Sequence, residues 1–234
     1  MQQPRTPSLR TGREDFDREL GQLEAELALM EGMVETALFN SLRALSNRDL
    51  ELSRRVIAED DRIDQKQVEI ELGCLELIRS QAPMAGDLRR IVSMLQVASE
   101  LERMGDYAEG IGKISLKMGH EPPIKELVDI PRMGDLAVSM LKRSLEAFLE
   151  KDQAEAERKA ATLGTDDDEV DALYERVVLD LLEIVKSSPD KSERATYLMW
   201  AAHNVERVAD RATNIAERAI FQATGRMVSG QSKI

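Results

Sequence analysis

Four pairs of carboxylate side chains in this chain have the form acid-x-x-x-Asp. Residues four apart lie on the same face of a helix, so each pair would project two carboxylates to one side. Like charges at this spacing destabilise a helix by a few tenths of a kcal/mol, and a cation that prefers oxygen ligands would offset that cost. The pairs are Asp60 with Asp64, Glu102 with Asp106, Asp167 with Asp171, and Glu206 with Asp210.

Two other interpretations of these acids stay open. A single pair in a chain with 44 acidic residues most simply solvates a helix surface. Recurrence of the pairs at matched positions makes a cation site an equally good interpretation. Arg103 and Arg207 directly follow the two glutamates, and ion pairs with neighbouring acids would give a network without metal.

The pairs recur because the chain contains an internal repeat. The segment 101–111 matches 205–215 at an offset of 104, and 60–64 and 75–80 match 167–171 and 182–187 at an offset of 107. Apolar residues in the first match recur at spacings of 3, 4 and 3, which is typical of one stripe along a helix. First helices match more weakly, at an offset of 107. Each half is therefore predicted to be three antiparallel helices around one core.

Turn-forming residues divide the chain into six long helical segments that begin near Glu14. The interruptions lie near 46–47, 81–86, 119–131, 151–152 and 187–191. The predicted organisation is all-α, with two tandem, pseudo-symmetric three-helix bundles. Its parts are a disordered tail at 1–12, the first repeat at 13–119, a Pro-rich connection at 120–131, the second repeat at 132–226 and a C-terminal tail at 227–234.

Two irregularities distinguish the second half. The fall in offset from 107 to 104 means that three residues are missing around 187–191, so the turn there is expected to be tighter. Gly164 stands where the first half has Ile57 and, with Thr165 and Asp166, predicts a local break in the fifth helix.

Composition narrows the classes of function. Aromatic residues are only 3% and charged residues 32%, a balance that suits helical packing. The formal net charge of −12 makes a nucleic-acid partner unfavourable. The single cysteine, Cys74, excludes an internal disulfide framework, and the N-terminus lacks a secretory signal. No apolar stretch is long enough to span a membrane, so the expected location is the cytoplasm, with membrane association only through a partner.

Other reactive side chains are weak candidates. His120 lies in the Pro-rich connection and His203 precedes the second acidic motif by one turn. Neither belongs to a Glu-x-x-His pair, which argues against a ferritin-like di-iron enzyme. Cys74 falls on an apolar stripe and is expected to be an inert core thiol. No phosphate-binding loop, nucleophile elbow or dinucleotide fingerprint is present, so we predict that the chain is not an enzyme.

The repeated Glu-Arg-x-Gly/Ala-Asp segments, each preceded by an Asp-Asp-x-x-Asp-type helix start, resemble the PhoU family over about 15–225. The resemblance implies two three-helix bundles with multinuclear iron or zinc clusters, and manganese or magnesium as alternatives. It assigns the eight acids named above as the ligands. It also implies a negative regulator of phosphate uptake and phosphate-starvation signalling that is a homodimer.

As partners, the resemblance implies the high-affinity phosphate ABC transporter with its ATPase and a membrane sensor histidine kinase. An acidic helical molecule without catalytic geometry suits such an adaptor. The alternative class is a metal-dependent hydrolase or a metal-storage bundle, which turnover of phosphoesters would reveal.

One departure from the family pattern concerns an amide. The family usually has Asn four residues after the motif Asp, as Asn214 stands here, whereas the first half has Gly110. A supporting amide holds a ligand or metal-bound water in place, and its loss typically costs roughly 10- to 100-fold in affinity. The second half is therefore expected to form the better metal site.

Overall fold

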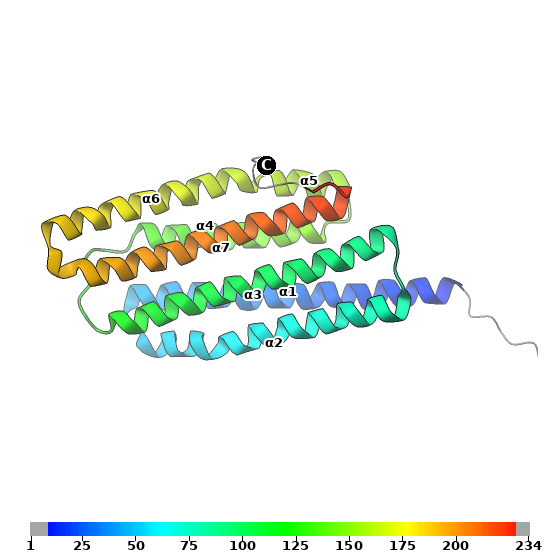
Figure 1. The fold of residues 1–234 in the computed structure, drawn as a ribbon, viewed down its shortest axis with the longest axis horizontal. Coiled ribbons are helices and arrows are strands. Elements are labelled where there is room, and N and C mark those ends of the chain that lie inside the picture. Colours follow the sequence, from blue (N-terminus) through cyan, green and yellow to red (C-terminus); the bar gives the residue numbers. More distant parts are fainter. Residues whose placement is uncertain (1–8, 228–234) are drawn as a thin grey trace, which may run out of the picture.

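The regular elements of the protein are helices throughout the part that the structure covers (Figure 1). The computed structural model describes residues 9–227, and this range contains no strand. The all-α prediction is confirmed, with the fifth predicted segment divided into α5 and α6. The elements are α1 (Leu9–Asn47), α2 (Leu50–Gln81), α3 (Ala85–Met118), α4 (Asp129–Leu149), α5 (Gln153–Ala161), α6 (Leu163–Ser187), a 3-10 turn η1 (Pro189–Lys191) and α7 (Ser192–Thr224).

The predicted start of the first helix is too late. Helix α1 begins at Leu9, so residues 9–12 of the predicted tail are helical. The rest of that tail, and the C-terminal tail after Met227, lie outside the described residues. Within 9–227, no helix combines the length and the apolar composition needed to cross a membrane.

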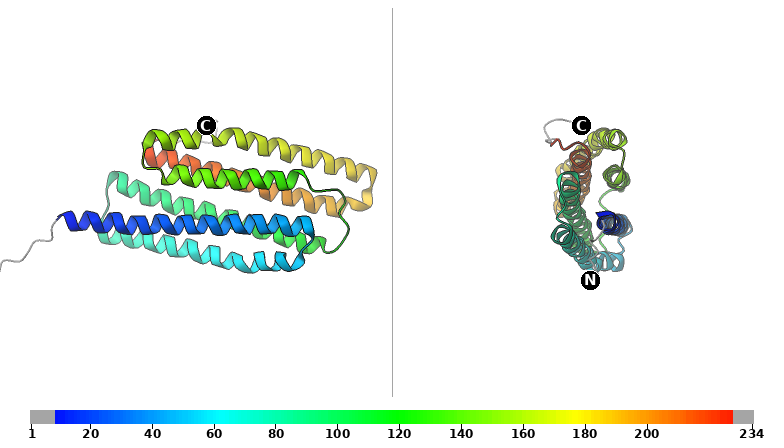
Figure 2. Two further views of the ribbon diagram at one scale, coloured as in Figure 1. Left: turned by 180° about the vertical axis from the view of Figure 1, so that it is seen from behind. Right: turned by 90° about the vertical axis from the view of Figure 1, so that its right-hand side faces the viewer.

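The six long segments form two pseudo-symmetric halves that pack side by side. Helices α3 and α7 lie next to each other on one side of the molecule, and α1 and α4 on the other (Figure 2). Helix α2 packs on α1 and α3 at one edge, and α6 packs on α4 and α7 at the other. One broad face of the molecule therefore presents α2, α3, α7 and α6 in that order (Figure 1).

The two halves share one hydrophobic core. Its cluster of buried side chains runs without a break from α1, α2 and α3 into α4, α6 and α7. Phe148, Leu27 and Met30 are among its largest fully buried members. Burial of such side chains contributes about 1.5–3 kcal/mol each relative to exposure. The halves are thus expected to unfold together.

Helices α1 and α4 approach closely where the halves meet. A Cβ atom added at Gly134 of α4 would stand only 2.1 Å from Leu42 Cδ1 of α1. Glycine is the residue that permits this approach, because it has no side chain to displace the facing leucine. Across the same interface, Lys142 of α4 bonds to Glu35 of α1 at 2.7 Å, two positions related by the repeat offset of 107.

The connection between the halves is shorter than the predicted range of 120–131. Helix α4 begins at Asp129, so Ile130 and Pro131 lie in its first turn. Proline is tolerated there because the first turn has no intrahelical partner for its missing N–H. Arg194 of α7 donates to the carbonyl of Pro122 at 3.1 Å and ties the connection to the second half.

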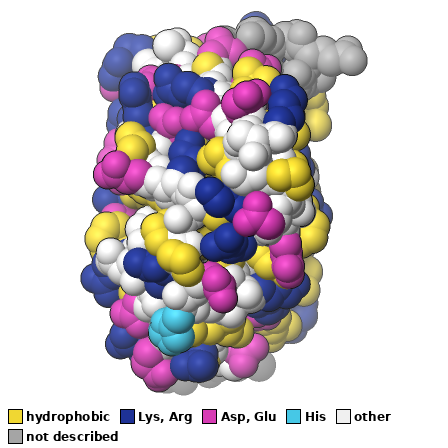
Figure 3. All heavy atoms as spheres, turned by 90° about the vertical axis from the view of Figure 1, so that its left-hand side faces the viewer, with side chains coloured by type: hydrophobic (Ala, Val, Ile, Leu, Met, Phe, Trp, Pro, Cys, Tyr) yellow, Lys and Arg dark blue, Asp and Glu magenta, His cyan; other side chains and the backbone are white. Residues whose placement is uncertain are grey.

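Basic and acidic side chains are intermingled over the left-hand end of the molecule (Figure 3).

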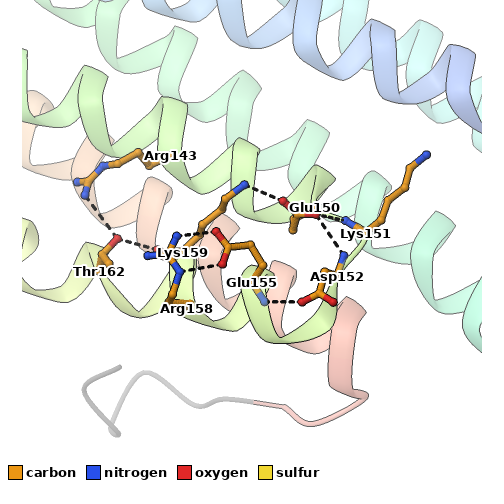
Figure 4. Close-up of polar contacts among 8 residues, drawn as sticks. All are labelled: Arg143, Glu150, Lys151, Asp152, Glu155, Arg158, Lys159 and Thr162. Carbon is orange, nitrogen blue, oxygen red and sulfur yellow. Dashed lines mark hydrogen bonds and ion pairs between the residues drawn. The ribbon is translucent and has the colours of Figure 1, made fainter.

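The predicted interruptions between the fourth and sixth segments have local causes (Figure 4). Asp152 accepts a hydrogen bond from the Glu155 backbone N–H at 2.9 Å and so caps the start of α5. The break predicted at Gly164 occurs at Thr162, whose hydroxyl donates to the Lys159 carbonyl at 2.7 Å. Gly164 itself lies inside α6.

The turn between α6 and α7 is not tighter than its counterpart, so that prediction is wrong. Residues 82–84 separate α2 from α3, whereas residues 188–191, with η1, separate α6 from α7. At the repeat offset of 104, the first residue of α7, Ser192, corresponds to Leu88, which is three residues inside α3. The missing residues therefore shorten the start of the helix and leave the turn intact.

Candidate metal centre

Carboxylates from the adjacent helices α2 and α3 converge in the first half. Asp64, Glu102 and Asp106 can each place one oxygen within 4.8 Å of the others. Asp106 also belongs to a second group of the same size with Asp60 and Glu109. Asp106 is thus shared between two sets of oxygen donors, and all four predicted first-half residues take part.

Glu109 is a member of this cluster that the sequence analysis missed. It follows Asp106 by three residues and so lies on the same side of α3. Its carboxylate is also bonded to Lys113 of the same helix. The i, i+3 spacing from a motif aspartate was the available signal, but the corresponding residue of the second half is Thr213, so the repeat comparison concealed it.

Asp60, Glu102 and Asp106 hold their protons more tightly than ordinary carboxylates, because their pKa values are raised. Burial, followed by the charges of Glu109, Asp64 and Asp106, raises the pKa of Asp60 to about 7. Burial is also the largest cause of the raised pKa of Glu102 and of Asp106, with neighbouring carboxylates adding to it. A cluster of this kind has unfavourable electrostatic energy when fully ionised, which a bound cation would relieve.

Gly105 lets α2 approach α3 at the level of the cluster. A Cβ atom at this position would stand 3.1 Å from Asp60 Oδ1 and from Ile63, closer than side chains normally pack. The corresponding residue of the second half is Ala209, which carries that methyl group. The glycine therefore provides a steric reason for the closer convergence of acids in the first half.

The second-half acids influence one another but converge less. Burial and the charges of Asp171, Asp210, Asp168 and Glu206 raise the pKa of Asp167 to about 6. Within residues 9–227, however, the only sets of three acids with oxygens within 4.8 Å of one another lie in the first half.

A basic neighbour bonds to one of the second-half acids, and a histidine lies near another. Asp210 accepts from Arg207 at 2.6 Å, and Glu206 Oε2 lies 3.3 Å from His203 Nδ1. Arg207 therefore forms one of the ion pairs that the interpretation without metal requires. The equivalent Arg103 is exposed and makes no ion pair in the described part of the chain.

Asn214, the residue behind the expectation of a better second-half site, has its amide nitrogen bonded to another helix. Its amide donates to Glu100 Oε2 of α3 at 3.2 Å, and Arg211 donates to the same oxygen at 3.3 Å. Asn214 follows Asp210 by one turn, but its amide bonds across to α3. It links the two halves, and the convergence of carboxylates favours the first half.

The remaining candidate residues lie outside the first-half groups of acids. Cys74 is fully buried, and burial raises the pKa of its thiol to about 12. His120 lies in the connection between α3 and α4, away from the helical acid motifs. His203 is half exposed and lies near both Glu206 and the ring of Tyr174.

The first-half donor set suits a metal ion. It consists of carboxylate oxygens from two adjacent helices, and hard or borderline cations take such ligands. Burial, together with neighbouring carboxylates, raises the pKa values of Asp60, Glu102 and Asp106, so their joint ionisation is unfavourable without a cation. Asp60, Asp64, Glu102, Asp106 and Glu109 would hold a cation here.

Comparison with known proteins bears on both halves. The PhoU domain model matches residues 27–115 and again residues 130–219, so one copy falls on each three-helix unit. The chain belongs to the PhoU family. The two matches together cover most of the chain.

Similar proteins extend this match to nearly the whole length. The phosphate-specific transport system accessory protein PhoU homologue of Caulobacter vibrioides is 36% identical over 217 residues, which is 92% of this chain and 93% of the relative. The homologue of the same description from Clostridium acetobutylicum is 34% identical over 92% of this chain and 97% of its own length.

Solved structures agree with the fold. The phosphate transport system regulatory protein PhoU from Streptococcus pneumoniae superposes with a TM-score of 0.81 at 31% identity, covering 92% of this chain and 99% of that one. PhoU from Pseudomonas aeruginosa superposes with a TM-score of 0.83 at 29% identity, covering 90% and 100%. Both bundles of the PhoU fold are therefore present here.

Proposed function

We propose that the chain is a negative regulator of phosphate uptake and of phosphate-starvation signalling, without enzymatic activity. The observation that carries this proposal is the pair of PhoU domain matches, together with relatives described as accessory proteins of the phosphate-specific transport system. The candidate polar site consists of carboxylates, with a histidine beside one of them in the second half.

The regulator would act as a cytoplasmic adaptor. Its proposed partners are the ATPase of the phosphate ABC transporter and the sensor histidine kinase, and its proposed assembly is a homodimer. The absence of a membrane-spanning helix within residues 9–227 is compatible with recruitment through these partners.

Metal binding is the second part of the proposal. Iron or zinc, or else manganese or magnesium, would bind first at the carboxylates of α2 and α3, and then at Asp167, Asp171, Glu206 and Asp210. A bound cation would neutralise carboxylate charge and tie neighbouring helices together. The acids themselves supply the ligands, and Gly105 sets how closely their helices approach.

Deletion of the gene tests the regulatory role. Cells without it should take up phosphate and transcribe starvation genes in phosphate-rich medium, and a plasmid copy should restore repression. Unchanged transporter expression in the deleted strain would contradict the proposal.

Two measurements on the purified protein test the rest. Elemental analysis of protein prepared without chelator should find metal, and the content should fall in an Asp106→Asn variant. Phosphoester turnover with added iron or manganese should stay at background. Robust turnover that is lost in Glu206→Gln would support a metal-dependent hydrolase instead.

A further inference from the structure

An apolar patch lies exposed on the outer face of the first half. Val68, Leu72 and Leu75 of α2 are 51–61% exposed, and Leu88 and Val92 of α3 are each 38% exposed. The α2 residues are spaced four and three apart, so they form one stripe along the helix. These five residues are the patch. Isolated exposed leucines are ordinary, whereas several exposed apolar side chains on two helices that pack together are typical of a contact surface.

The patch belongs to one half alone. Its positions correspond in the second half to Glu175, Leu179, Leu182, Ser192 and Thr196, so only two of the five remain apolar. Leu179 and Leu182 are likewise exposed, at 67% and 43%. The repeat thus supplies an internal control for what the additional apolar side chains do.

Negative charge adjoins the patch along the same helix pair. Asp64 precedes Leu75 by eleven residues, which places it about 16 Å away along α2. Asp64 belongs to the first-half carboxylate cluster, and Glu102, Asp106 and Glu109 lie further along α3 from Val92. Any helical segment laid along α2 and α3 over the patch would meet these acids within about five turns.

We propose that this surface docks a cationic amphipathic helix of a partner protein, with apolar side chains on the patch and Lys or Arg near the carboxylate cluster. The charge selects the occupant, because an acidic or anionic partner would be repelled by the cluster. Metal bound at the cluster would reduce the attraction, so the two ligands would compete. The inference deepens the adaptor role proposed above by naming the chemistry of one partner.

A model peptide provides the test. The probe is a labelled helix of about 18 residues, long enough to span about 27 Å, with leucine on one face and lysine elsewhere. Fluorescence anisotropy at low salt should show saturable binding, weakened by salt and by added metal. Leu75→Ser should weaken binding by about tenfold, the effect of a strong interface anchor. The matched control Leu182→Ser should leave the affinity unchanged.

Several outcomes would overturn the proposal. Equal binding of a peptide with glutamate in place of lysine would remove the charge argument, and equal loss in Leu75→Ser and Leu182→Ser would remove the assignment to the first half. Sedimentation of the protein alone tests whether a second copy of the chain occupies the patch. If Leu75→Ser turns a dimer into a monomer, the second copy is the occupant and the proposal is wrong. Melting temperatures check that both variants fold. Failure of the peptide to bind would overturn the docking proposal. It would leave the proposed regulatory role untouched, because the deletion experiment tests that role separately.

Discussion

The two halves place acids at the same four positions but surround them differently. In the first half, Gly105 allows α2 and α3 to close, and Glu109 adds a fifth carboxylate. In the second half, Ala209 fills the corresponding space, Thr213 replaces the extra acid, and Arg207 holds Asp210 at 2.6 Å. Matching motifs therefore do not make matching sites, because residues between and beside the motif positions set how close the carboxylates come.

The largest expected effect comes from removing the carboxylate of Asp106, which the two first-half groups of acids share. Asp106→Asn should lower metal affinity by at least about tenfold, a loss seen even for outer-shell partners of metal sites. Asp210→Asn should have a much smaller effect, because that oxygen is already held by Arg207. Titration calorimetry of iron, manganese and zinc into apo protein measures both. Equal loss from the two variants would show that the halves bind metal alike.

The glycine comparison gives the next effect. Gly105→Ala should push Ile63 and Asp60 away by a few tenths of an ångström, since a Cβ there would stand 3.1 Å from each. Sites of this kind depend on geometry held within about 0.5 Å, so we expect metal affinity to fall by about threefold to tenfold. Ala209→Gly in the second half is the control and should not lower it. An unaffected Gly105→Ala protein would exclude helix approach as the cause.

Asn214 gives a prediction that separates protein stability from metal affinity. Asn214→Ala removes the hydrogen bond to the Glu100 carboxylate, so the free energy of unfolding should fall by about 1 kcal/mol. For a chain of this size that corresponds to about 2–4 °C in melting temperature. Metal affinity should not change, because the amide bonds to α3. Loss of metal with unchanged stability would restore the supporting role expected from the sequence.

The last prediction concerns pH. The pKa of Asp60 is raised from 3.8 to about 7 in the folded protein, so between these values the folded state binds a proton that the unfolded state has lost. The contribution of the Asp60 carboxyl to the free energy of unfolding is therefore present at low pH and declines as pH rises toward and through 7. In chelator, the melting temperature should drop between pH 5 and pH 8, and less so in Asp60→Asn. The exposed Asp61→Asn should keep the full drop, and equal drops in the two variants would contradict this assignment.

The sequence by itself determined the helical architecture. Apolar stripes at spacings of three and four, and turn residues such as Asp152, are local signals that specify helices and their ends. The repeat located the four acid pairs and the family resemblance, and the family is confirmed by the two PhoU domain matches. These features depend on neighbours within a few positions along the chain.

The tertiary structure decided what each motif position faces. Asn214 bonds to Glu100, more than a hundred residues away in sequence. The close approach of α2 to α3 depends on the absence of a side chain at Gly105. The missing residues near 187–191 shortened α7 and left its turn intact, because packing fixes where a helix can start. Sequence spacing gives the direction of a side chain along one helix, whereas the distance between helices depends on the side chains that pack between them.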